Sequence, residues 1–165
     1  MIQKYSINVE NGYLCPDNDQ LETPMTLYRV DRLNRTHAAL TLDFSIAHPV
    51  DKAVEGVIIT ERASESGWIQ LPVFPFQQNP CPKILNGSFK ESRALFINFG
   101  KAIGLENIEK CDFPAGHYSV NRFPVEIGND MPFWEGRFRF TAILRRSATK
   151  KKLFCAVTVI SFKEM

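Results

Sequence analysis

The chain has 165 residues, of which 44% are hydrophobic, and its formal net charge is +2. This length supports one domain with a sizeable core, and the apolar content excludes a disordered chain. A charge this close to neutral disfavours a general nucleic-acid binder, whose affinity depends on many phosphate contacts. No apolar run approaches the length of a membrane span, and the first residues lack the apolar core of a signal sequence. These features indicate either a cytosolic protein or a mature secreted one that begins with an added Met.

The first half of the chain reads as β-structure after an irregular start. Residues 1–24 are polar and contain two prolines, so we expect an irregular arm with room for one short strand. Strands are expected at 26–33 and 54–60, and the clearest alternation in the chain covers 37–46. Apolar residues there recur at every second position, which predicts a half-buried antiparallel strand. Residues 68–76 are apolar but contain two prolines, which favours an edge or irregular strand.

The period then changes to that of a helix. Ser88 and Glu91 match a capping box, in which a hydroxyl and a carboxylate satisfy the first backbone amides. Leu95, Phe99 and Ile103 follow at helical spacing, and Gly104 stands where a left-handed C-terminal residue belongs. The pattern predicts one amphipathic helix over about 88–103.

Three strands are expected after the helix. The run 116–127 contains Pro124, which cannot donate a ladder hydrogen bond and predicts an edge strand or a bulge. Residues 137–145 alternate again, whereas 153–162 are apolar on both faces. A strand of the latter kind is covered on both sides, and we expect the helix to provide the second cover. The sequence therefore predicts one mainly β domain over 1–165, an antiparallel β-cup or sandwich of about seven to eight strands with one α-helix.

The cysteines and sequons favour a secreted protein. The four cysteines lie far apart, which suits two disulfides, although four buried free thiols are the alternative. Asn34 and Asn86 each begin an Asn-x-Ser/Thr sequon and are candidate glycosylation sites. No Cys-x-x-Cys or other metal-ligand spacing is present, so no metal is expected.

The sequence contains no recognisable catalytic motif, and we expect neither an enzyme nor a cofactor. The three histidines are expected to be surface or turn residues. The basic cluster at 145–152 is either a solvated turn or a surface that attracts anionic lipid or glycan groups. The connection 131–134 either plugs the core or forms an apolar rim at a cavity mouth. Thirteen Phe residues indicate either a tightly packed core or a lined cavity.

Several motifs in the last third of the chain resemble a known family. They are Cys111-x-Phe-Pro-Ala-Gly-His-Tyr-Ser, Met131-Pro-x-Trp134, and a Lys-rich turn followed by Leu153-x-Cys155. Together they are similar to the ganglioside activator proteins and, more closely, to their insect relatives, within the wider ML lipid-recognition group. The resemblance implies a β-cup whose apolar interior holds acyl chains, in a non-enzymatic carrier of lipid, fatty acid or glycolipid. The mammalian activators have more cysteines than this chain, so transfer of lipid to a hydrolase is not carried over.

These observations lead to three hypotheses and a set of site residues. The first hypothesis is a secreted lipid or glycolipid carrier, the second is an extracellular protein that recognises a microbial or cell-surface glycan, and the third is an unrecognised hydrolase. Even-numbered residues of 38–46 and 138–144 should point inward, and we expect a gate for lipid at 131–134. The predicted cavity and rim residues are Leu42, Phe44, Phe138, Phe140, Met131, Phe133 and Trp134. The predicted disulfides are Cys15–Cys155 and Cys81–Cys111.

Overall fold

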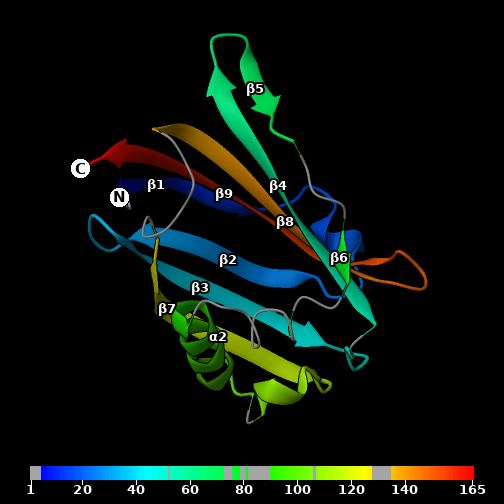
Figure 1. Ribbon diagram of the computed structural model, residues 1–165. Helices are drawn as coiled ribbons and strands as arrows, with labels where there is room; N and C mark the ends of the chain where they lie inside the picture. Colours follow the sequence, from blue (N-terminus) through cyan, green and yellow to red (C-terminus); the bar gives the residue numbers. More distant parts are fainter. Residues whose placement is uncertain are drawn as a thin grey trace.

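In the part of the chain that it describes, a computed structural model shows two antiparallel sheets and a long α-helix beside the smaller sheet (Figure 1). It describes residues 5–51, 53–72, 76–78, 81, 90–105, 107–127 and 135–165. The larger sheet contains β1 (Tyr5–Leu14), β9 (Lys152–Glu164), β8 (Gly136–Arg146), β4 (Val54–Ser64) and β5 (Gly67–Gln70) in this order, with β6 (Gln77–Gln78) also paired to β4. The smaller sheet has the order β2 (Met25–Arg32), β3 (His37–Ile46) and β7 (Gly116–Glu126). The predicted mainly β fold with one helix is confirmed, and the described strands form no closed barrel.

The N-terminal arm is more regular than the sequence analysis expected. β1 is ten residues long and pairs antiparallel with β9, from Tyr5 opposite Glu164 to Leu14 opposite Ala156. Tyr5 and Ile7 are buried, and Val9 continues their alternation. The long strand forms because this alternation places an apolar row against the core, while β9 supplies a complete row of backbone partners.

β7 has both features that Pro124 predicted. It pairs only with β3 among the described strands, so it is an edge strand of the smaller sheet. Its register also shifts where Leu40 and Leu42 meet Phe123 and Val120, which marks a bulge. The bulged segment includes Arg122 at φ 55°. An edge position and a bulge both reduce the number of ladder hydrogen bonds that proline interrupts.

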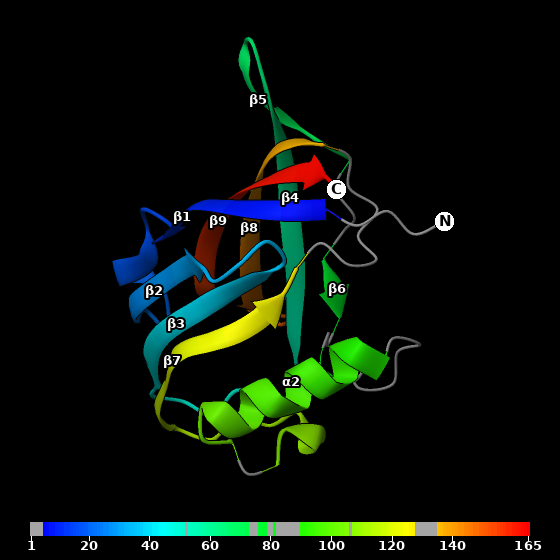
Figure 2. The same ribbon diagram turned by 90° about the vertical axis from the view of Figure 1, so that its left-hand side faces the viewer.

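The helix α2 (Lys90–Ala102) begins inside the predicted range and ends one residue before it does. Gly104 follows with φ 98°, the left-handed conformation that the sequence indicated. The expected packing of the helix directly on the last strand is wrong. Instead α2 packs against β7 and against the short 3₁₀ helix η2 (Ile108–Lys110), alongside β7 in both views (Figures 1 and 2).

β9 is nevertheless buried on both faces, as its sequence predicted. On one face Ile160 and Phe162 join the core between the sheets. On the other face Cys155 and Val157 pack with Cys15 and Leu21, which follow β1. The N-terminal segment therefore covers the face that the helix was expected to cover, because the Cys15–Cys155 disulfide holds it there.

Both predicted disulfides are confirmed, and all four cysteines are paired. Cys15–Cys155 closes a sequence separation of 140 residues, and Cys81–Cys111 closes one of 30. In the described part of the chain, no helix is long and apolar enough to cross a membrane.

Candidate functional site: an apolar cavity between the sheets

The space between the two sheets has a filled end and a hollow end. At the filled end Phe138 is completely buried, with its ring centre 5.8 Å from that of Phe162 and 6.2 Å from that of Phe140. Ala38 of β3 belongs to the same cluster, and its small side chain leaves room for these rings. Interlocking aromatic rings thus fill this part of the interior.

The hollow end begins where the side chains of β8 become smaller. The inward-facing residues of this strand change from Phe138 and Phe140 to Ala142 and Leu144. Ala142 lies directly opposite Ala156 of β9, so only two methyl groups meet at this level of the sheet. At the filled end, by contrast, the rings of Phe138 and Phe162 are in contact. A cavity of about 320 Å³ lies over this pair.

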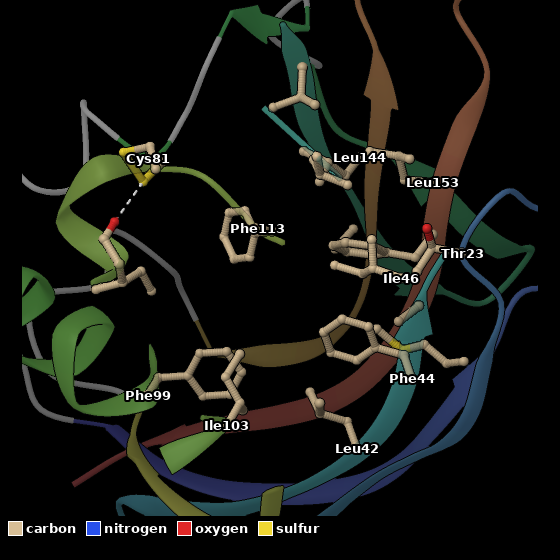
Figure 3. A pocket seen from close by; sticks show the side chains of 18 of the residues that line it. Thr23, Leu42, Phe44, Ile46, Cys81, Phe99, Ile103, Phe113, Leu144 and Leu153 are labelled. Atoms are coloured by element: carbon tan, nitrogen blue, oxygen red, sulfur yellow. Dashed lines mark hydrogen bonds between the residues drawn. A yellow bond between two sulfur atoms is a disulfide. The ribbon is translucent and has the colours of Figure 1, made fainter. Parts of the chain in front are cut away.

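Apolar side chains from both sheets and from the helix form the cavity wall. Figure 3 shows Leu144 and Leu153 of the larger sheet facing Leu42 and Phe44 of the smaller one. The helix contributes Phe96 and Phe99, which share one face because they are three residues apart, and Ile103 follows directly after the helix. The remaining apolar wall consists of Met25, Ile46, Val50, Val54, Ile108, Phe113 and Phe154.

The Cys81–Cys111 disulfide belongs to this wall. Both cysteines line the cavity and pack with Phe96 and Ile97 of the helix. The bond joins a position before the helix to the residue that follows η2, so it restrains the chain on both sides of α2. The disulfide therefore closes a loop of the chain that contains both α2 and η2.

Few polar side chains reach the cavity. The described lining residues include only Thr23, Tyr28 and Asp51 of this kind. The Tyr28 hydroxyl lies 2.6 Å from Thr158 Oγ1, and burial raises the pKa of Tyr28 although this hydrogen bond opposes the shift. A wall of this composition can exclude water and hold an apolar chain, but it supplies no pair of groups for acid–base chemistry.

The structure places the predicted cavity residues in two different environments. Leu42 and Phe44 line the cavity as predicted. Phe138 and Phe140 also point inward, but they pack at the filled end and do not line this cavity. The predicted gate of Met131, Phe133 and Trp134 lies outside the described residues, as does the sequon at Asn86.

Hydrophobic periodicity does not identify the residues that make the hollow. Ala142 and Ala156 are ordinary members of apolar rows, and Thr23 lies in the stretch that was expected to be an irregular arm. A drop in side-chain size within a row of Phe and Leu is the available sequence signal for the first two. Thr23 carries no comparable signal.

Other candidate groups lie on the surface. His117 Nε2 is 2.9 Å from Asp43 Oδ2, and the Thr26 hydroxyl donates to Asp43 Oδ1 at 2.7 Å. These two hydrogen bonds, the Thr26 bond first, lower the pKa of Asp43. Since the hydroxyl donates to the carboxylate and not to the imidazole, this is not the arrangement that activates a nucleophile.

The basic turn between β8 and β9 is largely neutralised by carboxylates. Glu55 pairs with two of its members, Glu22 with a third and Asp17 with a fourth. The four paired basic residues are Arg145, Lys150, Arg146 and Lys152. These pairs favour the solvated-turn interpretation of the cluster.

No protein-family profile matches this chain, and no curated protein is significantly similar to it.

Proposed function

We propose that this protein is a secreted, non-enzymatic lipid-binding or carrier protein that holds an acyl or alkyl chain in the cavity between its sheets. The observation that supports the proposal is the hollow end itself, a space of about 320 Å³ with an almost entirely apolar wall. Water is bound only weakly in such a space, because it finds few hydrogen-bonding partners there. An apolar chain is the occupant that suits this wall best.

The expected affinity follows from the burial of methylene groups. Each buried CH₂ contributes about 0.8 kcal/mol, so ten of them contribute about 8 kcal/mol, equivalent to a Kd of about 1 µM before the chain is ordered. The cavity volume lies near the lower limit of the roughly 300–1,000 Å³ typical of small-molecule sites. It therefore suits one chain better than two.

Filling the hollow tests the proposal. Ala142→Phe should place a ring over Ala156, so we expect a folded protein that no longer binds 1-hexadecanol or a fluorescent alkyl probe. Thr141→Phe, which adds a ring on the outer face of the same strand, is the matched control and should bind normally. Normal binding by folded Ala142→Phe would contradict the proposal, as would the absence of lipid binding by the delipidated wild-type protein.

Secretion and the family resemblance belong to the same proposal. Two disulfides support an oxidising compartment. Asn34 is exposed in the turn between β2 and β3, where its Oδ1 accepts hydrogen bonds from the backbone of Thr36 and His37. Glycosylation of the Asn34 amide stays a prediction. The likeness to ganglioside activator proteins also stays a prediction, and the cavity is compatible with it.

The alternative, recognition of a glycan at the surface, has less support. Trp68 is an aromatic side chain on the outer face of the larger sheet. The guanidinium carbons of Arg137 and Arg139 lie 5.1 and 4.7 Å from its ring centre, so the ring already has two partners. The cavity is the feature that favours the lipid hypothesis over this one.

A further inference from the structure

The cavity has one polar corner, and its centre is Thr23. This residue lies between η1 (Asn18–Gln20) and β2, and only 4% of it is exposed. Its backbone N–H donates to the Leu153 carbonyl at 3.0 Å, which holds it against the cavity wall (Figure 3). The hydroxyl makes no hydrogen bond to any residue that the structure describes. A buried hydroxyl without a partner is unfavourable, so a hydrogen-bonding group on a ligand would be stabilised there.

Asp51 also lines the cavity, but it is exposed to solvent and its Oδ1 accepts a hydrogen bond from the Ala53 backbone N–H at 2.9 Å. Arg146 Nε donates to Glu22 at 2.7 Å, next to Thr23, while its Nη2 lies 3.4 Å from the Pro49 carbonyl, close to Asp51. The hydrogen bond that Arg146 donates to Glu22, with a further contribution from the charge of Asp51, raises the pKa of Arg146. Arg146 therefore holds the segments that carry Thr23 and Asp51 together.

The charges of this corner do not suit an anionic ligand. Asp51 is the only charged side chain among the described residues that line the cavity, and none of them is Lys or Arg. The Arg146 guanidinium does not line the cavity and is already engaged by Glu22. A carboxylate in this cavity would find no unpaired cation, and the one charged group on the described wall is itself negative.

We propose that the cavity selects a single-chain lipid whose polar end is an uncharged hydroxyl or ester, hydrogen-bonded to Thr23, with the chain running toward Phe99 of α2 and the adjacent Ile103. This inference rests on the proposed function and specifies its ligand class. An alcohol complements Thr23 in both directions, because each hydroxyl can donate one hydrogen bond and accept others. A free fatty acid, ionised at neutral pH, is disfavoured by Asp51, and a lipid with two chains exceeds the volume.

The test uses the full-length, delipidated protein and displacement of the fluorescent probe N-phenyl-1-naphthylamine. We expect 1-hexadecanol to displace the probe at a concentration about tenfold lower than hexadecanoate at pH 8. Thr23→Val keeps the shape of the side chain but removes its hydroxyl, and it should weaken hexadecanol binding about fivefold, the effect of one hydrogen bond. Thr23→Ser should restore most of that affinity. Asp51→Asn should strengthen hexadecanoate binding more than hexadecanol binding, so the ratio of the two affinities should shift toward the carboxylate.

The outcomes separate this inference from the proposed function. Direct titration of the probe into Thr23→Val should give the wild-type Kd, which shows that the variant is folded and its cavity intact. If hexadecanol affinity is then also unchanged, or if hexadecanoate binds wild type as tightly as hexadecanol, the inference is overturned while lipid binding stands. If neither the probe nor any lipid binds the wild-type protein, the proposed function fails and the inference fails with it.

Discussion

At the scale of single residues, Glu55 is the most heavily used carboxylate of the described structure. Its side chain is only 4% exposed, and it accepts hydrogen bonds from Arg145 at 2.6 Å, Lys150 at 2.8 Å and Gln78 at 3.0 Å. The Lys150 hydrogen bond is the main reason that the pKa of Glu55 lies below its usual 4.5, and burial opposes the shift. Glu55 thus links β4, β6 and the turn between β8 and β9.

This lowered pKa predicts a dependence of stability on pH. A carboxyl group whose pKa is lower in the folded state contributes stability above its unfolded pKa and loses it as the pH falls through the folded pKa. The free energy of unfolding should therefore decrease as the pH falls below about 4.5, and Glu55→Gln should make that decrease shallower. Urea unfolding at a series of pH values measures both curves.

The control for this prediction is Glu10→Gln. Glu10 also pairs with an arginine, Arg137, but the pair is exposed, so its removal should change stability little. An identical acid slope in Glu55→Gln and wild type would show that Glu55 does not contribute to acid sensitivity.

At the scale of elements, the contact between α2 and η2 shapes the helical side of the cavity. Gly100 is the point of closest approach, because a Cβ atom built there would lie 2.5 Å from Ile108 Cδ1 and 2.9 Å from Ile108 Cβ. Ile108 lines the cavity together with Phe99 and Ile103. The glycine thus permits close packing at this position.

We predict that Gly100→Ala destabilises the protein by about 1–3 kcal/mol, the usual effect of overpacking, although alanine favours a helix more than glycine does. The measurement is the free energy of unfolding in urea. Asn98→Ala, at an exposed position of the same helix, should be nearly neutral.

The double variant Gly100→Ala/Ile108→Ala identifies the cause of this effect. Ile108→Ala removes the closest atom, Cδ1 at 2.5 Å, but keeps Cβ at 2.9 Å, so it relieves the clash in part. The double variant should therefore be somewhat more stable than the sum of the two single effects predicts. Simple additivity would show that the two residues do not restrain each other.

At the scale of the whole molecule, the two disulfides act on different parts of the structure. Cys15–Cys155 ties the segment after β1 to the last strand, and neither of its cysteines lines the cavity. Cys81–Cys111 closes the wall next to the helix. The first should therefore affect mainly global stability, and the second should also affect the cavity.

Replacement of each pair by serine tests this division. The chain-entropy relation predicts a loss of about 5 kcal/mol for the longer loop and about 3.6 kcal/mol for the shorter one, less any change within the native state. Where both variants remain folded, only Cys81→Ser/Cys111→Ser should bind 1-hexadecanol more weakly. Equal binding by both would contradict the role assigned to the second disulfide.

The sequence by itself determined the kind of most elements after the N-terminal arm, and the faces that β3 and β8 turn inward. Period-two rows predicted β3, β7, β8 and β9, because alternate residues of a strand share a face, and a helical row ending at Gly104 predicted α2. Local periodicity did not predict which segment covers the outer face of β9, since both the helix and the N-terminal segment could have packed there.

Tertiary structure alone decided where the interior is hollow. Periodicity shows that Phe138 and Ala142 face inward, but only strand register places Ala142 against Ala156 and Phe138 against Ile160. The cavity exists because the small residues Ala142 and Ala156 are paired across β8 and β9. Further along the same strands, the aromatic rings of Phe138, Phe140 and Phe162 fill the interior. The polar corner has the same origin: Thr23, Asp51 and Arg146 are distant in sequence, and the packing of the chain brings them together.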